Sequence, residues 1–86
     1  MALVFIPAML QNLTGGVSQV RIAGRTVHTV LNNLEERFPG VKDRLLQDGE
    51  LRPDIAVAVD GELALDLLDR VQEDSEVHFI PPISGG

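Results

Sequence analysis

The sequence ends in two glycines, Gly85 and Gly86, which present an unhindered carboxylate at the end of the chain. Glycine has no Cβ, so a terminal glycine pair lies extended in a narrow channel and leaves its carboxylate accessible from every side. A carboxylate becomes an electrophile only after one oxygen is converted into a leaving group. The chemistry expected at Gly86 is therefore activation followed by acyl transfer. The alternative is a frayed end without a function.

Two prolines before the glycines favour a stiff arm over a frayed end. Each proline fixes φ and lacks a backbone N–H, so the pair favours extended, polyproline-like geometry and ends any central strand. We expect a folded domain over residues 1–82 and a flexible Gly-Gly tail over residues 83–86. The candidate tail residues are Pro81, Pro82, Ile83, Ser84 and Gly85, with Gly86 as the reactive end.

No other set of residues predicts catalysis. The sequence has no cysteine, which excludes disulfides, thiolate metal sites and thiol nucleophiles. His28 and His78 are about fifty positions apart, and Ser84 has no evident base. The Thr14-Gly15-Gly16 step lacks the spacing and the lysine of a phosphate-binding loop, so it is interpreted as a turn. We expect no metal and no cofactor bound by the chain itself. Any catalytic activity would reside in a partner.

The composition predicts one small acidic domain of 86 residues. Neither a run of about 20 apolar residues nor a signal-peptide pattern is present, so we expect a cytoplasmic protein without membrane contact. The net charge is −6, and residues 47–76 hold ten acidic and two basic side chains. Such a surface repels nucleic acid. It either keeps the domain soluble or steers a basic partner toward it.

The first half of the chain predicts a hairpin followed by a helix. Residues 2–6 form an apolar run typical of an interior strand, and residues 17–22 alternate as a half-buried strand does. A helical turn is expected over residues 8–13. Thr26 is a suitable N-cap, and Pro39-Gly40 ends the helix. Between them, apolar residues recur at helical spacing: Val27, Val30, Leu31, Leu34 and Phe38.

The second half predicts a short helix and three strands. The helix is expected over residues 41–46, before an Asp48-Gly49 turn. Strands over residues 55–59 and 62–65 flank Asp60-Gly61, a pair that favours a type I′ turn. Leu67, Leu68 and Val71 form an apolar connection, and a polar turn over residues 73–76 leads to the last strand, Val77 to Ile80.

One helix covers only one face of such a sheet, so the other face is expected to be open. With Val4 and Ile6 facing the helix, Phe5 faces the other way, and in the last strand Val77 faces inward while His78 faces outward. An exposed apolar patch beside a functional tail is typical of a protein interface, the alternative being that loops cover it. The candidate interface residues are Phe5, Pro7, Leu63, His78 and Ile80.

The expected element order is that of the β-grasp, or ubiquitin-like, fold: an α+β domain with a mixed four- to five-stranded sheet and one main helix on one face. The run from Val77 to Gly86 closely resembles the end of the MoaD/ThiS family of sulfur carriers, in particular the small subunits of molybdopterin synthase. The segments 13–15 and 48–49 also resemble that family. The turn over residues 73–76 lacks the family's usual glycine, but aspartate tolerates a left-handed backbone better than most residues, so with Asp74 the turn can survive that loss.

The resemblance implies a cosubstrate for other proteins. An E1-like, ATP-dependent activating enzyme would convert the Gly86 carboxylate into an acyl-adenylate, with ATP used by that partner. A sulfur donor protein would displace AMP and leave a thiocarboxylate. The large subunit of molybdopterin synthase would then transfer the sulfur to a pterin precursor of the molybdenum cofactor.

Three alternatives share parts of this pattern. Sulfur carriers for cysteine or another sulfur-containing product have a similar tail and a similar segment around residues 14–16. A ubiquitin-like protein modifier shares the activation step, but a lysine amine then attacks the acyl group. A plain β-grasp interaction domain would not need its tail.

Overall fold

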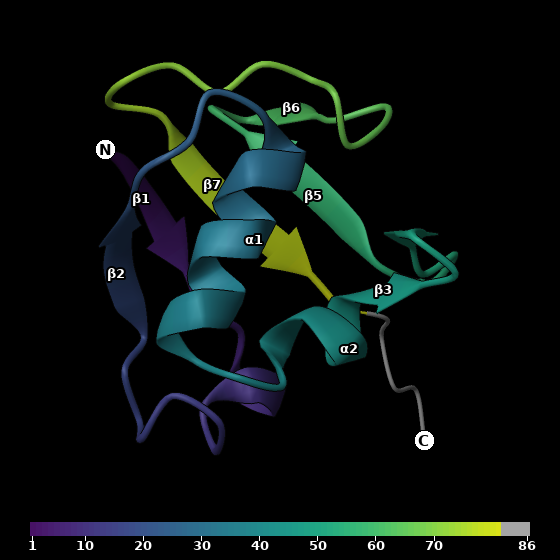
Figure 1. The fold of residues 1–86 in the computed structure, drawn as a ribbon. Helices are drawn as coiled ribbons and strands as arrows, with labels where there is room; N and C mark the ends of the chain where they lie inside the picture. Colours follow the sequence, from purple (N-terminus) through teal and green to yellow (C-terminus); the bar gives the residue numbers. More distant parts are fainter. Residues whose placement is uncertain (82–86) are drawn as a thin grey trace.

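The computed structural model describes residues 1–81 of the chain. Within these residues one mixed sheet has the strand order β2-β1-β7-β5-β6, in which β1 and β7 are parallel and the other neighbours are antiparallel (Figure 1). This sheet confirms the β-grasp prediction, and β7, which leads to the tail, lies in its middle. The strands are β1 (Ala2–Phe5), β2 (Gln19–Ile22), β5 (Ala56–Val59), β6 (Glu62–Leu63) and β7 (Glu76–Ile80).

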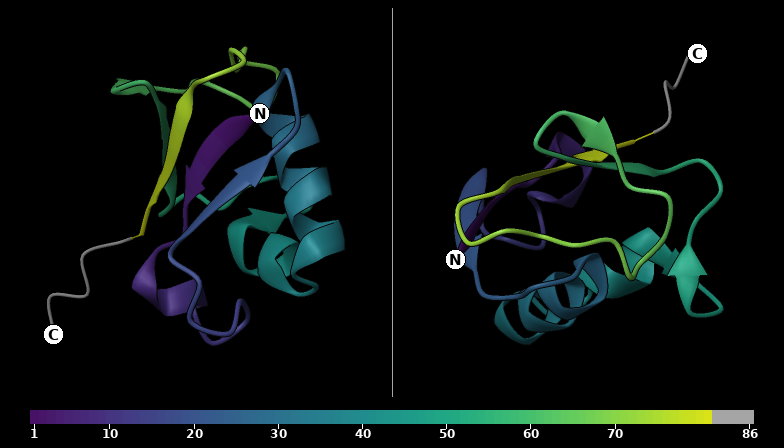
Figure 2. Two further views of the ribbon diagram at one scale, coloured as in Figure 1. Left: turned by 90° about the vertical axis from the view of Figure 1, so that its left-hand side faces the viewer. Right: turned by 90° about the horizontal axis from the view of Figure 1, so that it is seen from above.

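The main helix, α1 (Val27–Arg37), begins at the predicted cap and packs on one face of the sheet (Figure 2). The Thr29 backbone N–H donates to Thr26 Oγ1 at 3.2 Å, which satisfies one of the free amides of the first turn. Phe38 follows the helix and packs half-buried against the core. The residues that α1 buries are Val27, Val30, Leu31 and Leu34, the stripe predicted from their spacing.

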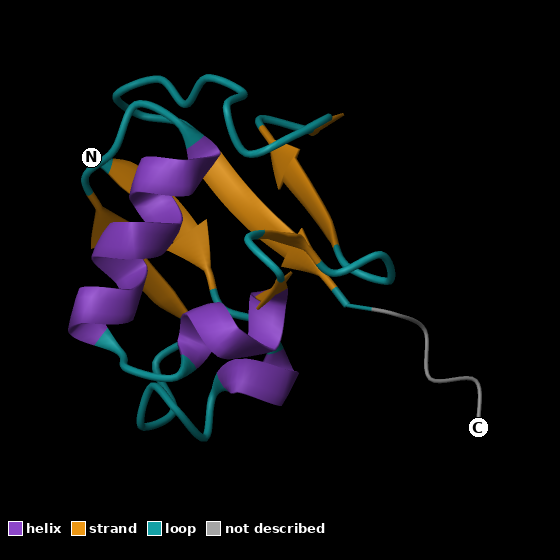
Figure 3. Ribbon diagram, turned by 45° about the vertical axis from the view of Figure 1, so that its right-hand side comes forward, coloured by secondary structure: helices purple, strands orange, loops and turns teal. Residues whose placement is uncertain are grey.

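Two short helices complete the helical part of the described chain. The 3-10 helix η1 (Ala8–Leu10) buries Leu10, and α2 (Val41–Leu45) lies on the same side of the sheet as α1 (Figure 3). None of the helices within residues 1–81 has the length and apolar character needed to cross a membrane.

The interior of the sheet is built from alternate residues of the two parallel strands. Val4 of β1 and Val77 of β7 are register partners, and both are fully buried. On the other side of β7, Phe79 pairs with Val57 of β5. Because consecutive side chains of a strand point to opposite faces, this register leaves Phe5 and His78 on the face away from α1. The predicted alternation of both strands is confirmed.

The Asp60–Gly61 turn has the predicted geometry, since both residues have positive φ, at 52° and 85°. The strand after it is shorter than predicted, because β6 ends at Leu63 and not at residue 65. The backbone N–H of Leu65 donates instead to the Asp69 carboxylate at 2.8 Å. This bond removes Leu65 from the ladder and begins a loop.

A second, unpredicted hairpin surrounds Asp48–Gly49. It consists of β3 (Leu46–Gln47) and β4 (Glu50–Leu51), which pair only with each other. Two-residue strands carry no alternating pattern, so the sequence signalled the turn but not the strands. Smaller differences are that β2 begins at Gln19 and that α2 ends at Leu45.

Candidate functional site

The tail predicted to carry the chemistry follows the end of β7. Ile80 is the last residue of that strand and pairs with Ala56, and Pro81 follows it half-buried. The remaining tail residues lie outside the described part of the chain, so the roles predicted for them stay predictions. They are Pro82, Ile83, Ser84, Gly85 and Gly86.

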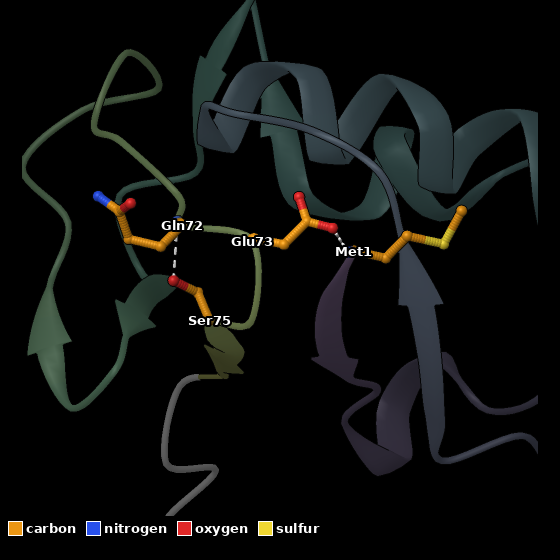
Figure 4. A network of polar contacts seen from close by, with 4 residues as sticks. All are labelled: Met1, Gln72, Glu73 and Ser75. Carbon is orange, nitrogen blue, oxygen red and sulfur yellow. Dashed lines mark hydrogen bonds and ion pairs between the residues drawn. The ribbon is translucent and has the colours of Figure 1, made fainter.

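The start of β7 is fixed by a polar network around Ser75, which is only 1% exposed. Its Oγ accepts from the Gln72 N–H at 2.8 Å (Figure 4) and donates to Asp60 Oδ2 at 2.7 Å. Asp60 Oδ1 accepts from the Glu76 N–H at 2.9 Å. The N–H of Glu76 and then the Ser75 hydroxyl hold the pKa of Asp60 below its ordinary value, against the opposing effect of desolvation. The network ties β7 to the β5–β6 turn.

This network, and not a left-handed aspartate, stabilises the turn over residues 73–76. Asp74 is not left-handed, because Asp48 and Asp60 are the non-glycine residues with positive φ in the described chain. The buried Ser75 hydroxyl holds the turn instead. Beside it, the ammonium of Met1 lies 2.7 Å from Glu73 Oε1, and this hydrogen bond lowers the pKa of Glu73 (Figure 4). Both side chains of that pair are exposed, so its contribution to stability is small.

The face of the sheet away from α1, here called the open face, carries one row of paired side chains across all five strands. Neither α1 nor α2 covers it (Figure 2). Register partners share a face, and a continuous set of pairs runs from β2 to β6. Arg21, Leu3 and Glu76 form a parallel row beside it. The central row is Gln19, Phe5, His78, Ala58 and Leu63.

Phe5 and His78 form the centre of the open face. Their rings are stacked, with centroids 4.0 Å apart and planes 9° from parallel. His78 Nε2 lies 3.5 Å from Glu76 Oε1, and the side chain remains 42% exposed. Ile80, two residues along β7, is 45% exposed, and Leu63 is 64% exposed. The open face therefore continues to the point where the chain leaves the sheet.

The structure brings together four of the five predicted interface residues. Pro7 lies beyond β1, at the start of η1, where the strand register does not extend. Sequence reasoning missed Leu3, Ala56 and Ala58, which the register adds to the open face. Only the strand pairing places these residues on the open face, because the alanines of an apolar run do not indicate which side of the strand is exposed. Within residues 1–81, no three His, Asp or Glu side chains are grouped as metal ligands.

A comparison with known families identifies the domain. The model of the ThiS family matches residues 4–86, which is nearly the whole chain. The chain belongs to the ThiS family. Its ThiS-family match confirms the MoaD/ThiS resemblance, and the chain is a member of a ubiquitin-like sulfur carrier and modifier family.

The relatives of this ThiS-family chain have several roles. It is 36% identical over 64 residues to small archaeal modifier protein 3 of Haloferax volcanii, covering 71% of this chain and 70% of that protein. It is 28% identical to the sulfur carrier protein CysO of Mycobacterium tuberculosis, covering 96% of each. It is 31% identical to the molybdopterin synthase sulfur carrier subunit of Phaeosphaeria nodorum, covering 92% of this chain and 83% of that one.

Solved structures agree with the ThiS-family fold. A chain in the crystal structure of the Amycolatopsis orientalis BexX/CysO complex superposes with a TM-score of 0.95 at 30% identity, and the match covers all of both chains. The two chains thus share the β-grasp fold, and the solved chain is part of a complex.

Proposed function

We propose that this chain is a sulfur carrier whose working group is the C-terminal carboxylate of Gly86. A carboxylate oxygen attacks the α-phosphorus of ATP in an activating partner enzyme, and pyrophosphate leaves. A donor of sulfide-level sulfur then attacks the carbonyl carbon, forming a C–S bond while AMP departs. The product is a thiocarboxylate, a soft nucleophile. The observation that best supports this proposal is the family match, which extends through the terminal glycine pair.

The open face supplies a docking surface consistent with this role. Phe5 and His78 are half-buried and Leu63 is exposed in one row of this face, and the exposed Ile80 connects that row to the beginning of the tail. A partner seated on this row holds the domain so that the tail is directed into the partner's active site. Apolar patches of this kind are typical of protein interfaces. The activating enzyme and the sulfur acceptor would use the same face in turn.

The test is intact mass spectrometry of the chain after incubation with ATP, an E1-like activating enzyme and a sulfur donor. We expect a mass gain equal to the replacement of one oxygen by sulfur. Deletion of Gly86 removes the reactive carboxylate from its position and is expected to abolish loading. It leaves the melting temperature unchanged, because the core lies within residues 2–79. Full loading of the truncated chain would contradict the proposal.

Two acceptors have specific support. The molybdopterin synthase large subunit is favoured by the Pro-Pro step and by the 31% identity to a synthase sulfur carrier subunit. An acceptor for another sulfur-containing product is favoured by the full-length fold match to a chain of the BexX/CysO complex. Loaded protein offered to each acceptor separates them: sulfur appears in a pterin dithiolene in the first case and in a different product in the second.

A role as a protein modifier is the remaining candidate, and the identity to small archaeal modifier protein 3 favours it. In that case a lysine amine of a target attacks the activated Gly86 carbonyl. Isopeptide-linked conjugates formed with ATP and activating enzyme, but without a sulfur donor, would support this role. Their absence, together with sulfur loading, supports the carrier role.

A further inference from the structure

The loop after β6 exposes two large apolar side chains. Leu65 is 90% exposed and Leu68 is 74% exposed, whereas Leu67 between them packs against the core. The sequence pattern predicts an apolar connection of Leu67, Leu68 and Val71; in the structure Val71 is buried and Leu67 packs against the core, while Leu68 is exposed. Burying a leucine side chain is worth about 1.5–3 kcal/mol. A partner that buried both leucine side chains of this short loop would therefore gain binding free energy.

Hydrogen bonds within the loop and to the start of α1 hold this loop in place. The Asp69 carboxylate accepts from the Leu65 N–H at 2.8 Å, and Asp66 Oδ1 accepts from the Leu68 N–H at 2.7 Å. At the start of α1, the N–H of His28 donates to the Leu67 carbonyl at 2.8 Å and that of Val27 to the Asp69 carbonyl at 3.1 Å. The leucines thus project from a fixed backbone. A partner meets a preorganised surface, which lowers the entropic cost of binding.

A groove of about 480 Å³ separates the loop from the β3–β4 hairpin. Both segments lie on the same side of the molecule (Figure 1). No residue of the open face lines this groove, so it is a separate surface. Leu68 also borders a second hollow of about 550 Å³ toward the β5–β6 turn, and so forms a ridge between two depressions. The groove is lined by Gly49, Glu50, Leu51, Leu65, Asp66, Leu67 and Leu68.

The charges around the groove indicate which kind of partner would bind there. Glu50 and Asp66 line it, and Asp69 lines the second hollow. Only two of the twelve charged residues in the segment 47–76 are basic. A second copy docked by the same surface would oppose these carboxylates to themselves, since a two-fold interface is self-complementary. Lysine or arginine side chains would pair with them, and an apolar side chain would fill the groove.

We propose that the loop over residues 64–69 and the β3–β4 hairpin form a second docking site for a partner protein. The occupant is a segment with an apolar anchor flanked by basic residues. The anchor packs on Leu65 and Leu68, and its basic neighbours pair with Glu50 and Asp66. The site is distinct from the open face, because no residue of that face lines the groove.

The test is a two-dimensional NMR titration of the full chain with a synthetic amphipathic peptide of alternating leucine and lysine blocks. We expect the largest amide shifts at residues 49–51 and 65–68, and affinity that falls as salt rises. The double variant Leu65→Ser/Leu68→Ser should weaken binding about tenfold or more without lowering the melting temperature, because both side chains are in water. The Glu50→Gln/Asp66→Asn variant should reduce the salt dependence while keeping the acceptor oxygen at position 66.

The matched controls are the variant Ile80→Ser and a peptide with glutamate in place of lysine. Ile80→Ser alters the open face alone and should leave the affinity for the leucine-lysine peptide unchanged. The glutamate peptide should not bind. Shifts confined to the open face, or equal affinity of the double leucine variant, would overturn the proposal. Concentration-dependent shifts at residues 65–68 without any peptide would assign the surface to a second copy instead, and would also overturn it.

Discussion

At the residue scale, Gly24 has the least space for a side chain among the glycines of residues 1–81. It connects β2 to α1 with φ at 153°, a value that L-residues rarely adopt. A Cβ built there would lie 2.7 Å from Val30 Cγ2 and 2.8 Å from the Val30 backbone nitrogen. The backbone atom belongs to α1 and cannot move aside without shifting the helix. Gly24 therefore sets how closely the main helix approaches the chain leaving the sheet.

We predict that Gly24→Ala lowers the free energy of unfolding by about 2–3 kcal/mol, since it combines backbone strain with overpacking. Urea unfolding monitored by circular dichroism measures the change. Gly49→Asn is the matched control, because Gly49 is also left-handed, at φ 82°, but has no atom near its missing Cβ. Asparagine tolerates that conformation, so the control should cost less than about 1 kcal/mol. Equal losses in both variants would show that the contact with Val30 is unimportant.

At the element scale, a side chain of α1 caps the helix that follows it. Glu35 Oε1 accepts from the Lys42 N–H at 2.8 Å, and Oε2 accepts from the Gly40 N–H at 3.0 Å. These amides would otherwise be unpaired at the start of α2. The N–H groups of Gly40 and Lys42 lower the pKa of Glu35, and the Lys42 charge adds to this against desolvation. A five-residue helix is too short to be stable alone, so the cap from α1 helps to hold it.

We predict that Glu35→Ala destabilises the domain by about 1 kcal/mol at pH 7, the usual cost of losing a helix cap. Because the folded-state pKa of Glu35 is lowered, its contribution is fully present above the unfolded pKa of about 4.3. It is lost as the pH falls through the folded-state value. Unfolding curves at pH 7 and at pH 3 should therefore show the gap between wild type and variant closing in acid. Glu36→Ala, an exposed neighbour, is the control, and a gap that is constant with pH would contradict the assignment.

At the scale of the whole molecule, one face of the sheet forms the core and the other is the proposed docking surface. The inner face, with Val4, Val77 and Phe79, packs under α1 and holds the fold. The open face, with Phe5 and His78 at its centre, is half-exposed. β7 contributes to both faces, and its last residue, Ile80, lies on the proposed docking surface just before the tail, so one central strand belongs to both the core and that surface. This arrangement separates stability from binding at adjacent residues.

We predict that two neighbouring substitutions in β7 have opposite effects. Phe79→Ala removes a side chain that is 5% exposed and should destabilise the domain by about 3 kcal/mol or more. Ile80→Asp changes an exposed position and should leave the melting temperature within a few degrees, while weakening binding of the activating enzyme about tenfold or more. Calorimetry of unfolding and of binding measures both. Unaltered enzyme affinity in Ile80→Asp would remove the open face from the proposed function.

Sequence patterns predicted the elements whose residues follow a regular spacing or a strong turn preference. The stripe from Val27 to Leu34, the alternation in β7 and the Asp60–Gly61 turn each follow from a local periodicity or a backbone preference, which neighbouring residues alone determine. The β3–β4 hairpin and the end of β6 at Leu63 were not predictable in this way. A two-residue strand has no period, and the Leu65 N–H leaves the ladder only because Asp69 folds back to accept it.

The sequence by itself determined that this is a β-grasp domain with a terminal glycine pair, because strand and helix periods and the Pro-Pro-to-Gly-Gly tail are properties of contiguous residues. Only the tertiary structure decided which side chains share a surface. Phe5, Ala58 and Leu63 come from three strands and meet His78 through pairing register, and Leu65 and Leu68 remain in water because distant backbone groups hold their loop. Such neighbours depend on long-range contacts, which no local pattern records.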